Sequence, residues 1–135
     1  MTLFQSSSRC RGLSLIEMTL VIAIMLMLAS IVMYSLSSMG EWKQGRSSGE
    51  KLKAVYLAQK GYLADHPTES YGTLTAAKLI PYLPGRDSAL PTAKALNDSD
   101  LTLEITTMPP TFKLSGSVYD PSGSSTDGLW DTAGL

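Results

Sequence analysis

An uninterrupted apolar run near the N-terminus constrains this chain more than any other feature. The run extends from Leu13 to Met39 and carries one charged residue, Glu17, among its 27 positions. As a helix it would reach roughly 40 Å, more than the roughly 30 Å hydrocarbon core of a bilayer. Its central part, Leu20 to Tyr34, is apolar on all sides apart from Ser30. A helix on the surface of a soluble domain would show a polar face, so the run predicts a membrane-spanning helix.

The composition of the chain excludes several classes of function. The 135 residues leave room for one modest domain beyond the run, and the 11 basic residues against 12 acidic ones give no basic excess for nucleic acid. The single cysteine, Cys10, excludes an intrachain disulfide. The single histidine, His66, stands beside a proline and is interpreted as a loop residue, and no catalytic or nucleotide-binding motif is present. We expect no enzyme activity, no required cofactor and no nucleic-acid partner.

Three interpretations fit the length of the run. A secretory signal peptide would use Arg9 and Arg11 as its charged region and a cleavage site near Ser30, but the run continues past that point. An ionised Glu17 at the start of its apolar region would also be costly. An ordinary single-span anchor is the second interpretation, and its orientation is not settled because basic residues flank both ends of the run.

The residues around Gly12 favour a third interpretation. A short basic leader ends in Gly12, Leu13 follows, and Glu17 stands at the fifth position after that junction, before the remaining apolar residues. This combination resembles the N-terminal signature of type IV prepilins and of the pseudopilins of type II secretion. The resemblance covers roughly 30 of the 135 residues. It implies cleavage between Gly12 and Leu13 by a prepilin peptidase, which usually also methylates the new amino group of Leu13.

The sequence departs from the family pattern at three positions. Leu13 stands where the family most often has Phe, a substitution that such peptidases tolerate. Leu26 and Tyr34 stand where many pilins have helix-breaking Gly or Pro, and nothing between Leu20 and Ser38 would break a helix cheaply. A locally melted segment is therefore not expected here. Cleavage would also leave the mature chain without a cysteine.

The resemblance implies a filament subunit. Such a protein is a single-pass protein of the bacterial inner membrane with its head in the periplasm, and it polymerises through its N-terminal helix. Its partners are other copies of itself, other pseudopilins, the prepilin peptidase, an inner-membrane platform protein and an assembly ATPase. Glu17 has no evident partner in its own chain, so we expect it to pair with the amino terminus of a neighbouring subunit and to set the register of assembly. The alternatives are a membrane-tethered binding module that does not polymerise and a minor pilin in adhesion or DNA uptake.

The remaining sequence divides the chain into a leader (1–12), a filament-core helix (13–39), an amphipathic continuation (40–66) and a small loop and β-sheet region (67–135). Within the continuation, helical spacing relates five apolar residues: Leu52, Val55, Tyr56, Tyr62 and Leu63. Three glycines, Gly40, Gly45 and Gly49, predict a flexible or kinked neck. His66 and Pro67 should end the helix because the residue before proline avoids helical geometry.

The last region predicts a short helix and a hairpin. The helix should run from Leu74 to Leu79, between Thr73 and Pro81. Residues 101–106 alternate between apolar and polar, and residues 112–118 repeat the pattern, which is typical of two strands with one buried face. Because an isolated hairpin is barely stable, it should pack on the helix around residues 55–63. The expected fold is α+β, a long N-terminal hydrophobic helix continuing into a small head with an antiparallel sheet, which is type IV pilin-like.

One candidate ligand site lies near the C-terminus. The segment from residue 120 to residue 131 holds Asp120, Asp127 and Asp131 among Gly and Ser residues. Oxygen ligands on such a loop suit Ca²⁺, and the segment resembles the late calcium loop of major pseudopilins. The same residues are also typical of a solvated turn. If calcium binds, Trp130 should close the loop by packing against the sheet.

Overall fold

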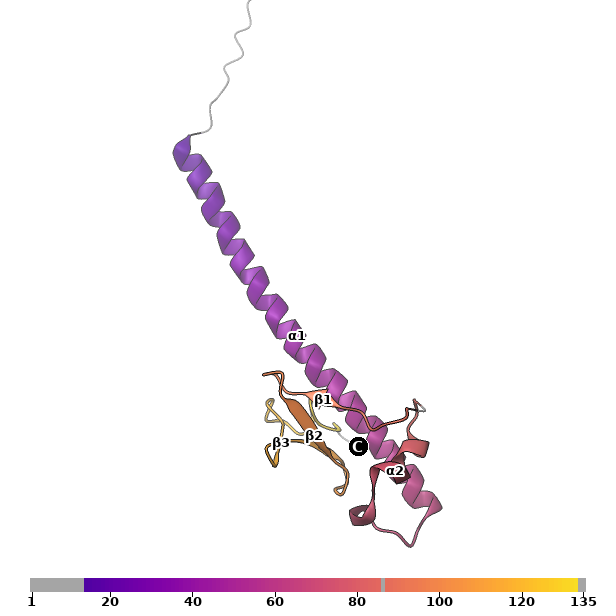
Figure 1. Ribbon diagram of the computed structural model, residues 1–135. Helices are drawn as coiled ribbons and strands as arrows, with labels where there is room; N and C mark the ends of the chain where they lie inside the picture. The colour runs from indigo at the N-terminus through magenta and orange to yellow at the C-terminus, as the bar shows by residue number, and fades with distance from the viewer. Residues whose placement is uncertain (1–13, 86, 134–135) are drawn as a thin grey trace, which may run out of the picture. The chain divides into compact units, whose positions relative to one another are not determined.

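The computed structural model describes residues 14–85 and 87–133 (Figure 1). The chain divides into two compact units, Met1–Ser37, called here the N-terminal unit, and Ser38–Leu135, called the head unit. The described part of the N-terminal unit is helical except for Ser14, and the head unit adds a four-stranded antiparallel sheet and short helical turns. The fold is therefore α+β with a long N-terminal apolar helix, as the sequence predicts.

The long helix α1 runs from Leu15 to Asp65. It ends directly before His66 and Pro67, where the proline was expected to end it. No break occurs at Leu26 or Tyr34, as expected from the absence of Gly and Pro there. The helix continues through Gly40, Gly45 and Gly49, all three of which belong to the head unit. A flexible or kinked neck stays a prediction.

The sheet consists of β1 (Ala93–Lys94), β2 (Asp100–Glu104), β3 (Thr111–Leu114) and β4 (Ser117–Val118), in that spatial order. The predicted hairpin is confirmed as β2 and β3, which pair antiparallel with Leu103 opposite Phe112. The single strand predicted over residues 112–118 is wrong. The chain reverses at Ser115 and Gly116, whose φ angles are 52° and 89°, and β4 pairs back on β3. A two-residue turn with both φ angles positive matches the twist of antiparallel strands.

Three short helical segments follow α1: η1 (Tyr71–Thr73), α2 (Ala76–Leu79) and η2 (Ile80–Tyr82). The predicted helix at 74–79 therefore exists but begins two residues later, after Thr75 rather than Thr73. Pro81 does not stop it by itself, because a proline is accepted in the first turn of the following 3-10 helix. Leu79 and Leu83 are buried, and they fix this segment against α1.

The core of the head unit consists of two clusters along α1. One joins helix residue Leu52 to the sheet and the C-terminal segment, and its buried members are Leu52, Ala93, Ala95, Leu101, Phe112 and Trp130. The other joins α1 to the segment around α2, and its buried members are Val55, Ala58, Tyr62, Leu74, Leu79 and Leu83. In Figure 1 the sheet and α2 accordingly lie beside the C-terminal part of α1. The hairpin thus packs on the helix as predicted.

Two glutamines of α1 connect the helix to the sheet through backbone carbonyls. Gln59 is fully buried, and its Nε2 donates to the carbonyl oxygens of Ile105 at 2.8 Å and Thr107 at 3.1 Å. Gln44 donates in the same way to the carbonyls of Lys94 and Ala95. Buried carbonyls without such partners would be costly, so these amides stabilise the ends of β1 and β2.

Candidate functional site

Glu17 lies in the first turn of α1, three residues after Ser14. The amides of Glu17 and Met18 donate to the Ser14 carbonyl, and the Ser14 amide donates to Glu17 Oε2 over a long 3.4 Å. Serine followed three residues later by glutamate is the sequence pattern of a capping box, in which the acid accepts from the backbone amide of the residue that precedes the helix, here Ser14. The expectation that Glu17 has no partner within its own chain is therefore wrong. Its negative charge also faces the positive end of the helix dipole.

The processing residues Gly12 and Leu13 lie outside the described residues. Cleavage between them, and methylation of Leu13, stay predictions. The structure does place the residue that would follow Leu13. Ser14 directly precedes the first helical residue, Leu15, so the helix would begin at the third residue of the mature chain.

The large apolar side chains between Leu15 and Met39 are exposed. The least exposed of them is Val21 at 41%, and Tyr34 reaches 80%. A soluble monomer rarely leaves so continuous an apolar surface in water, because burying it elsewhere is strongly favourable. By length and composition, α1 could cross a membrane.

Hydroxyl groups within the apolar run bond to the helix backbone. Thr19 donates its hydroxyl to the Ile16 carbonyl, and Ser30 donates to the Leu26 carbonyl, both at 2.9 Å. In a hydrocarbon environment every polar group needs a partner inside the protein, and these two hydroxyls have one. The run is therefore compatible with lipid or with the apolar side chains of neighbouring helices.

The three aspartates of the candidate calcium loop each bind a nearby backbone amide. Asp120 accepts from the Ser122 amide, and Asp127 accepts from the Leu129 amide. Asp131 Oδ1 accepts from the amides of Gly128 and Ala133. In the described residues no three His, Cys, Asp or Glu side chains gather closely enough to hold a metal ion. The loop is thus built from side chain to backbone turns, the alternative that the sequence left open.

Two of these aspartates share a cavity. Asp120 and Asp131 line a space of about 160 Å³ together with Ser125, whereas Asp127 is not part of its lining. Asp131 Oδ2 is buried there without a hydrogen-bond partner. Calcium at this cavity stays a prediction, now on Asp120 and Asp131. If it binds, millimolar calcium will raise the melting temperature of the chain, and Asp131→Asn will abolish that rise. A wild-type chain whose melting temperature does not rise would contradict calcium binding.

Trp130 anchors the C-terminal loop on α1. Its side chain is 5% exposed, it packs edge-on against Tyr119, and its backbone amide donates to the Gly45 carbonyl at 3.1 Å. A Cβ at Gly45 would lie 2.4 Å from the Trp130 ring, and one at Gly49 would lie 2.4 Å from the Gly128 carbonyl oxygen. The two glycines are therefore needed for close approach of the loop. From the sequence alone the two glycines are only weak points of a helix, because their contact with the loop joins residues far apart in the chain.

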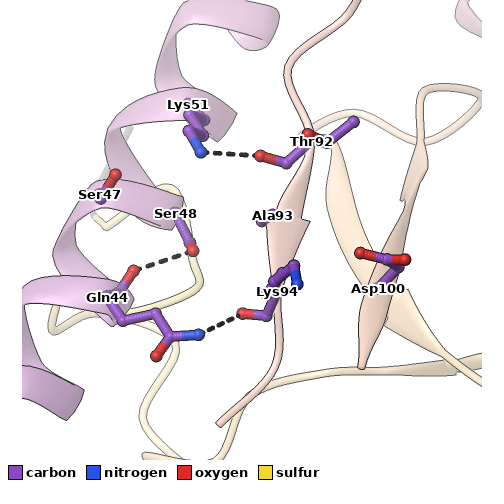
Figure 2. Close-up of a pocket in the computed structure, with 8 residues that line it drawn as sticks. All are labelled: Gln44, Ser47, Ser48, Lys51, Thr92, Ala93, Lys94 and Asp100. Carbon is purple, nitrogen blue, oxygen red and sulfur yellow. Dashed lines mark hydrogen bonds between the residues drawn. The ribbon is translucent and has the colours of Figure 1, made fainter. Parts of the chain in front are cut away.

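A polar cleft of about 290 Å³ lies between α1 and the edge strand β1 (Figure 2). The Lys51 ammonium donates to the Thr92 carbonyl at 2.7 Å, and Gln44 at the opposite end donates to the Lys94 carbonyl (Figure 2). These side chains hold the edge strand against the helix. The cleft was not identifiable from the sequence, because its two walls are about 45 residues apart in the chain.

Two ion pairs shift the pKa values of groups on the head unit. The Lys78 ammonium hydrogen-bonds to Glu69, and this bond lowers the pKa of the Glu69 carboxyl and raises the pKa of Lys78. The pKa of Glu104 is lowered first by the Thr106 hydroxyl and then by Lys113, whose Nζ lies 3.1 Å from the carboxylate. Both pairs are partly solvent-exposed, so they adjust stability modestly.

His66 lies in the loop after α1, as predicted. Its ring stacks on Tyr62 at 4.3 Å between ring centroids, and its Nδ1 lies 3.0 Å from the Tyr62 carbonyl oxygen. The neighbouring Asp65 accepts a hydrogen bond from the Tyr82 hydroxyl at 2.8 Å, which raises the pKa of Tyr82. These contacts give Asp65 and His66 a structural role at the end of α1.

Comparison with known proteins found no match. No family model, no curated protein and no solved structure is similar enough to this chain to assign it. The functional interpretation therefore depends on the N-terminal residues and on the two structural units described above.

Proposed function

We propose that this chain is a structural subunit of a type II secretion pseudopilus or of a related type IV pilus-like filament. A prepilin peptidase would cut between Gly12 and Leu13, and the mature chain would be held in the inner membrane by the first part of α1. It would then polymerise through that helix. Other pseudopilins, a platform protein and an assembly ATPase would supply the remaining parts of the machinery.

The observation that carries the proposal is the apolar surface of the N-terminal unit, which begins at Leu15, two residues after Leu13. Its side chains are exposed from Leu15 onward. Lipid could cover them before assembly, and the same side chains on neighbouring subunits could cover them afterwards. The small head unit, with its own core, would then lie outside that apolar layer.

The first test is processing. The full chain, produced together with a prepilin peptidase, should be shortened at Gly12, and mass spectrometry of the product should give Leu13 as a methylated N-terminus. Gly12→Ala should abolish the cut. Ser8→Ala, in the same leader but away from the junction, is the matched control and should be cleaved normally. Maturation of the Gly12→Ala chain to the same product would contradict the proposal.

The second test separates two roles of Glu17. Glutamine can still accept the hydrogen bond of a capping box but carries no charge, whereas alanine does neither. If Glu17 pairs with the amino terminus of a neighbouring subunit, Glu17→Gln and Glu17→Ala will both be cleaved and inserted yet fail to enter filaments. Losing one partner of a buried ion pair costs on the order of 3–5 kcal/mol. Filament incorporation is measured by shearing and immunoblotting.

The alternative function is a membrane-tethered binding module, and one observation favours it. Because Glu17 caps its own helix, a simple tether also has a use for this acid. Normal filament incorporation of Glu17→Gln, with loss only in Glu17→Ala, would show that capping alone is required. The absence of filaments from the wild-type chain, although cleavage and partner proteins are in place, would favour the tether.

A further inference from the structure

The head unit has an apolar groove at the end where the chain leaves the apolar run. The groove has a volume of about 250 Å³, and its walls are Ser38, Glu41 and Trp42 of α1 together with Leu96, Pro121, Ser122, Leu129 and Trp130. Trp42 is 56% exposed and Leu96 is 42% exposed. Large apolar side chains are thus presented together at this end of the head unit, which marks an interaction site.

The position of Trp42 along α1 indicates what covers this groove. The uncharged stretch Met18–Gly40 has 23 residues, which span about 35 Å as a helix and suffice for the roughly 30 Å hydrocarbon core of a bilayer. Trp42 follows Gly40 by two residues, about 3 Å further along the helix. That distance falls within the headgroup layer, where tryptophan is enriched because its ring is apolar and its N–H is polar.

The other walls of the groove fit the same layer. Leu96, Pro121 and Leu129 are apolar, whereas Ser38, Glu41 and Ser122 carry polar groups. A mixture of this kind suits the glycerol and headgroup region better than the hydrocarbon core, where a carboxylate would be expensive. Lys43, also exposed, follows directly and can reach lipid phosphates.

We infer that, before assembly, this groove rests on the lipid headgroup layer, with Trp42 as its anchor and Leu96 as a second apolar contact. The inference depends on the proposed membrane span of α1 but not on filament formation. It assigns the membrane-proximal end of the head unit a lipid-binding role in addition to the span itself.

The test uses the fluorescence of the two tryptophans in the full chain. The chain is reconstituted into phosphatidylcholine and phosphatidylglycerol vesicles that carry bromine, a quencher, either near the glycerol or near the bilayer centre. Subtracting the signal of Trp42→Phe from that of the wild type isolates Trp42, since Trp130 is buried. Because Trp42 is exposed, this variant should fold normally. We expect shallow bromine to quench Trp42 about twofold more strongly than deep bromine.

Three further variants make the result decisive. Leu96→Ser should reduce the shallow quenching of Trp42, whereas Leu57→Ser, at an even more exposed leucine farther along α1, should leave it unchanged. Leu26→Trp in a chain with Trp42→Phe reports on the span and should be quenched by deep bromine. If it is quenched while Trp42 is not, the inference fails and the span stands. If neither is quenched, both the inference and the membrane part of the proposed function fail.

A second copy of the chain is the competing occupant. In that case the emission of Trp42 would be insensitive to bromine at either depth and would change with the ratio of protein to lipid. This outcome would overturn the inference in favour of a protein contact.

Discussion

The two parts of helix α1 differ in what packs against them. In the N-terminal unit, leucine, isoleucine and methionine side chains are exposed, and Met33 is 74% exposed. In the head unit, the same helix buries the apolar residues Leu52, Val55 and Tyr62, and it also buries Gly45 and Ser48, which are not strongly apolar. Hydrophobicity alone therefore does not indicate which part of this helix has a partner within its own chain. Burial depends on what packs against the helix. A continuous surface of exposed large apolar residues is typical of a site that contacts a membrane or another protein.

The contrast has a geometric reason. The C-terminal loop approaches α1 so closely that a Cβ at Gly45 or Gly49 would collide with it, so only small residues fit that face. The C-terminal loop does not pack on the apolar run, so large side chains fit there. Small residues thus allow close packing where the loop meets α1, whereas the large side chains of the apolar run stay exposed.

The largest expected effect comes from deleting a buried ring. Phe112 is 0% exposed and lies in the cluster between sheet and helix. Phe112→Ala should destabilise the head unit by about 3–5 kcal/mol, because it removes apolar contacts and leaves a cavity. The free energy of unfolding is measured by urea titration of the full chain in detergent, followed by tryptophan fluorescence. Leu26→Ala, a truncation in the exposed run, is the comparison and should leave this transition unchanged. Equal losses of unfolding free energy in the two variants would contradict the difference between the two parts of α1.

The next effect comes from adding a methyl group to the small-residue face. A Cβ at Gly49 would lie 2.4 Å from one backbone oxygen and 3.0 Å from another, so the loop must move. Gly49→Ala should cost about 1–3 kcal/mol despite the higher helix propensity of alanine. Gly40→Ala meets nothing within 4 Å and should instead stabilise the helix by up to about 1 kcal/mol. The same urea titration compares them, and a stabilising Gly49→Ala would show that the loop is not held there.

The smallest effect concerns pH and belongs to the head unit alone. The pKa of Glu104 is lowered from 4.5 by the Thr106 hydroxyl and Lys113, so folding favours the ionised carboxylate. The unfolded chain then binds more protons than the folded chain as the pH falls below 4.5. The contribution of Glu104 is therefore complete above that pH and is lost as the pH falls through the lowered value. Glu104→Gln should flatten the acid limb of a plot of melting temperature against pH, and Glu41→Gln should not.

Several elements were predictable because their causes are local. The alternation of residues 101–106 predicted the strand β2, because a strand follows from side-chain period. Pro67 predicted the end of α1, because the residue before a proline avoids helical geometry. The serine and glutamate at the start of α1 are a capping-box pattern that the sequence displays, yet Glu17 was interpreted only through its charge. That signal was available and was missed.

Other features depend on residues far apart in the chain. β1 is two residues long, and nothing in Ala93 and Lys94 favours a strand until Asp100 and Leu101 pair with them. The contact of Trp130 with Gly45 joins positions 85 residues apart, and it turns a glycine that weakens helices into one that the fold requires. Among the three aspartates, only the folded loop decides that Asp120 and Asp131 share a cavity and that Asp127 does not.

By itself, the sequence determined that this chain has a long apolar helix, a helix end at Pro67 and a central β-hairpin, since these follow from composition, period and backbone sterics. The apolar spacing also predicted that Leu52, Val55 and Tyr62 share one face of α1, and all three are buried. The tertiary structure alone decided that the C-terminal loop packs on Gly45 and Gly49, where the sheet begins and ends, and which side chains line the groove at Trp42. The physical reason is that burial and close approach are properties of pairs of surfaces. A single sequence shows one member of each pair, and only the fold shows the other.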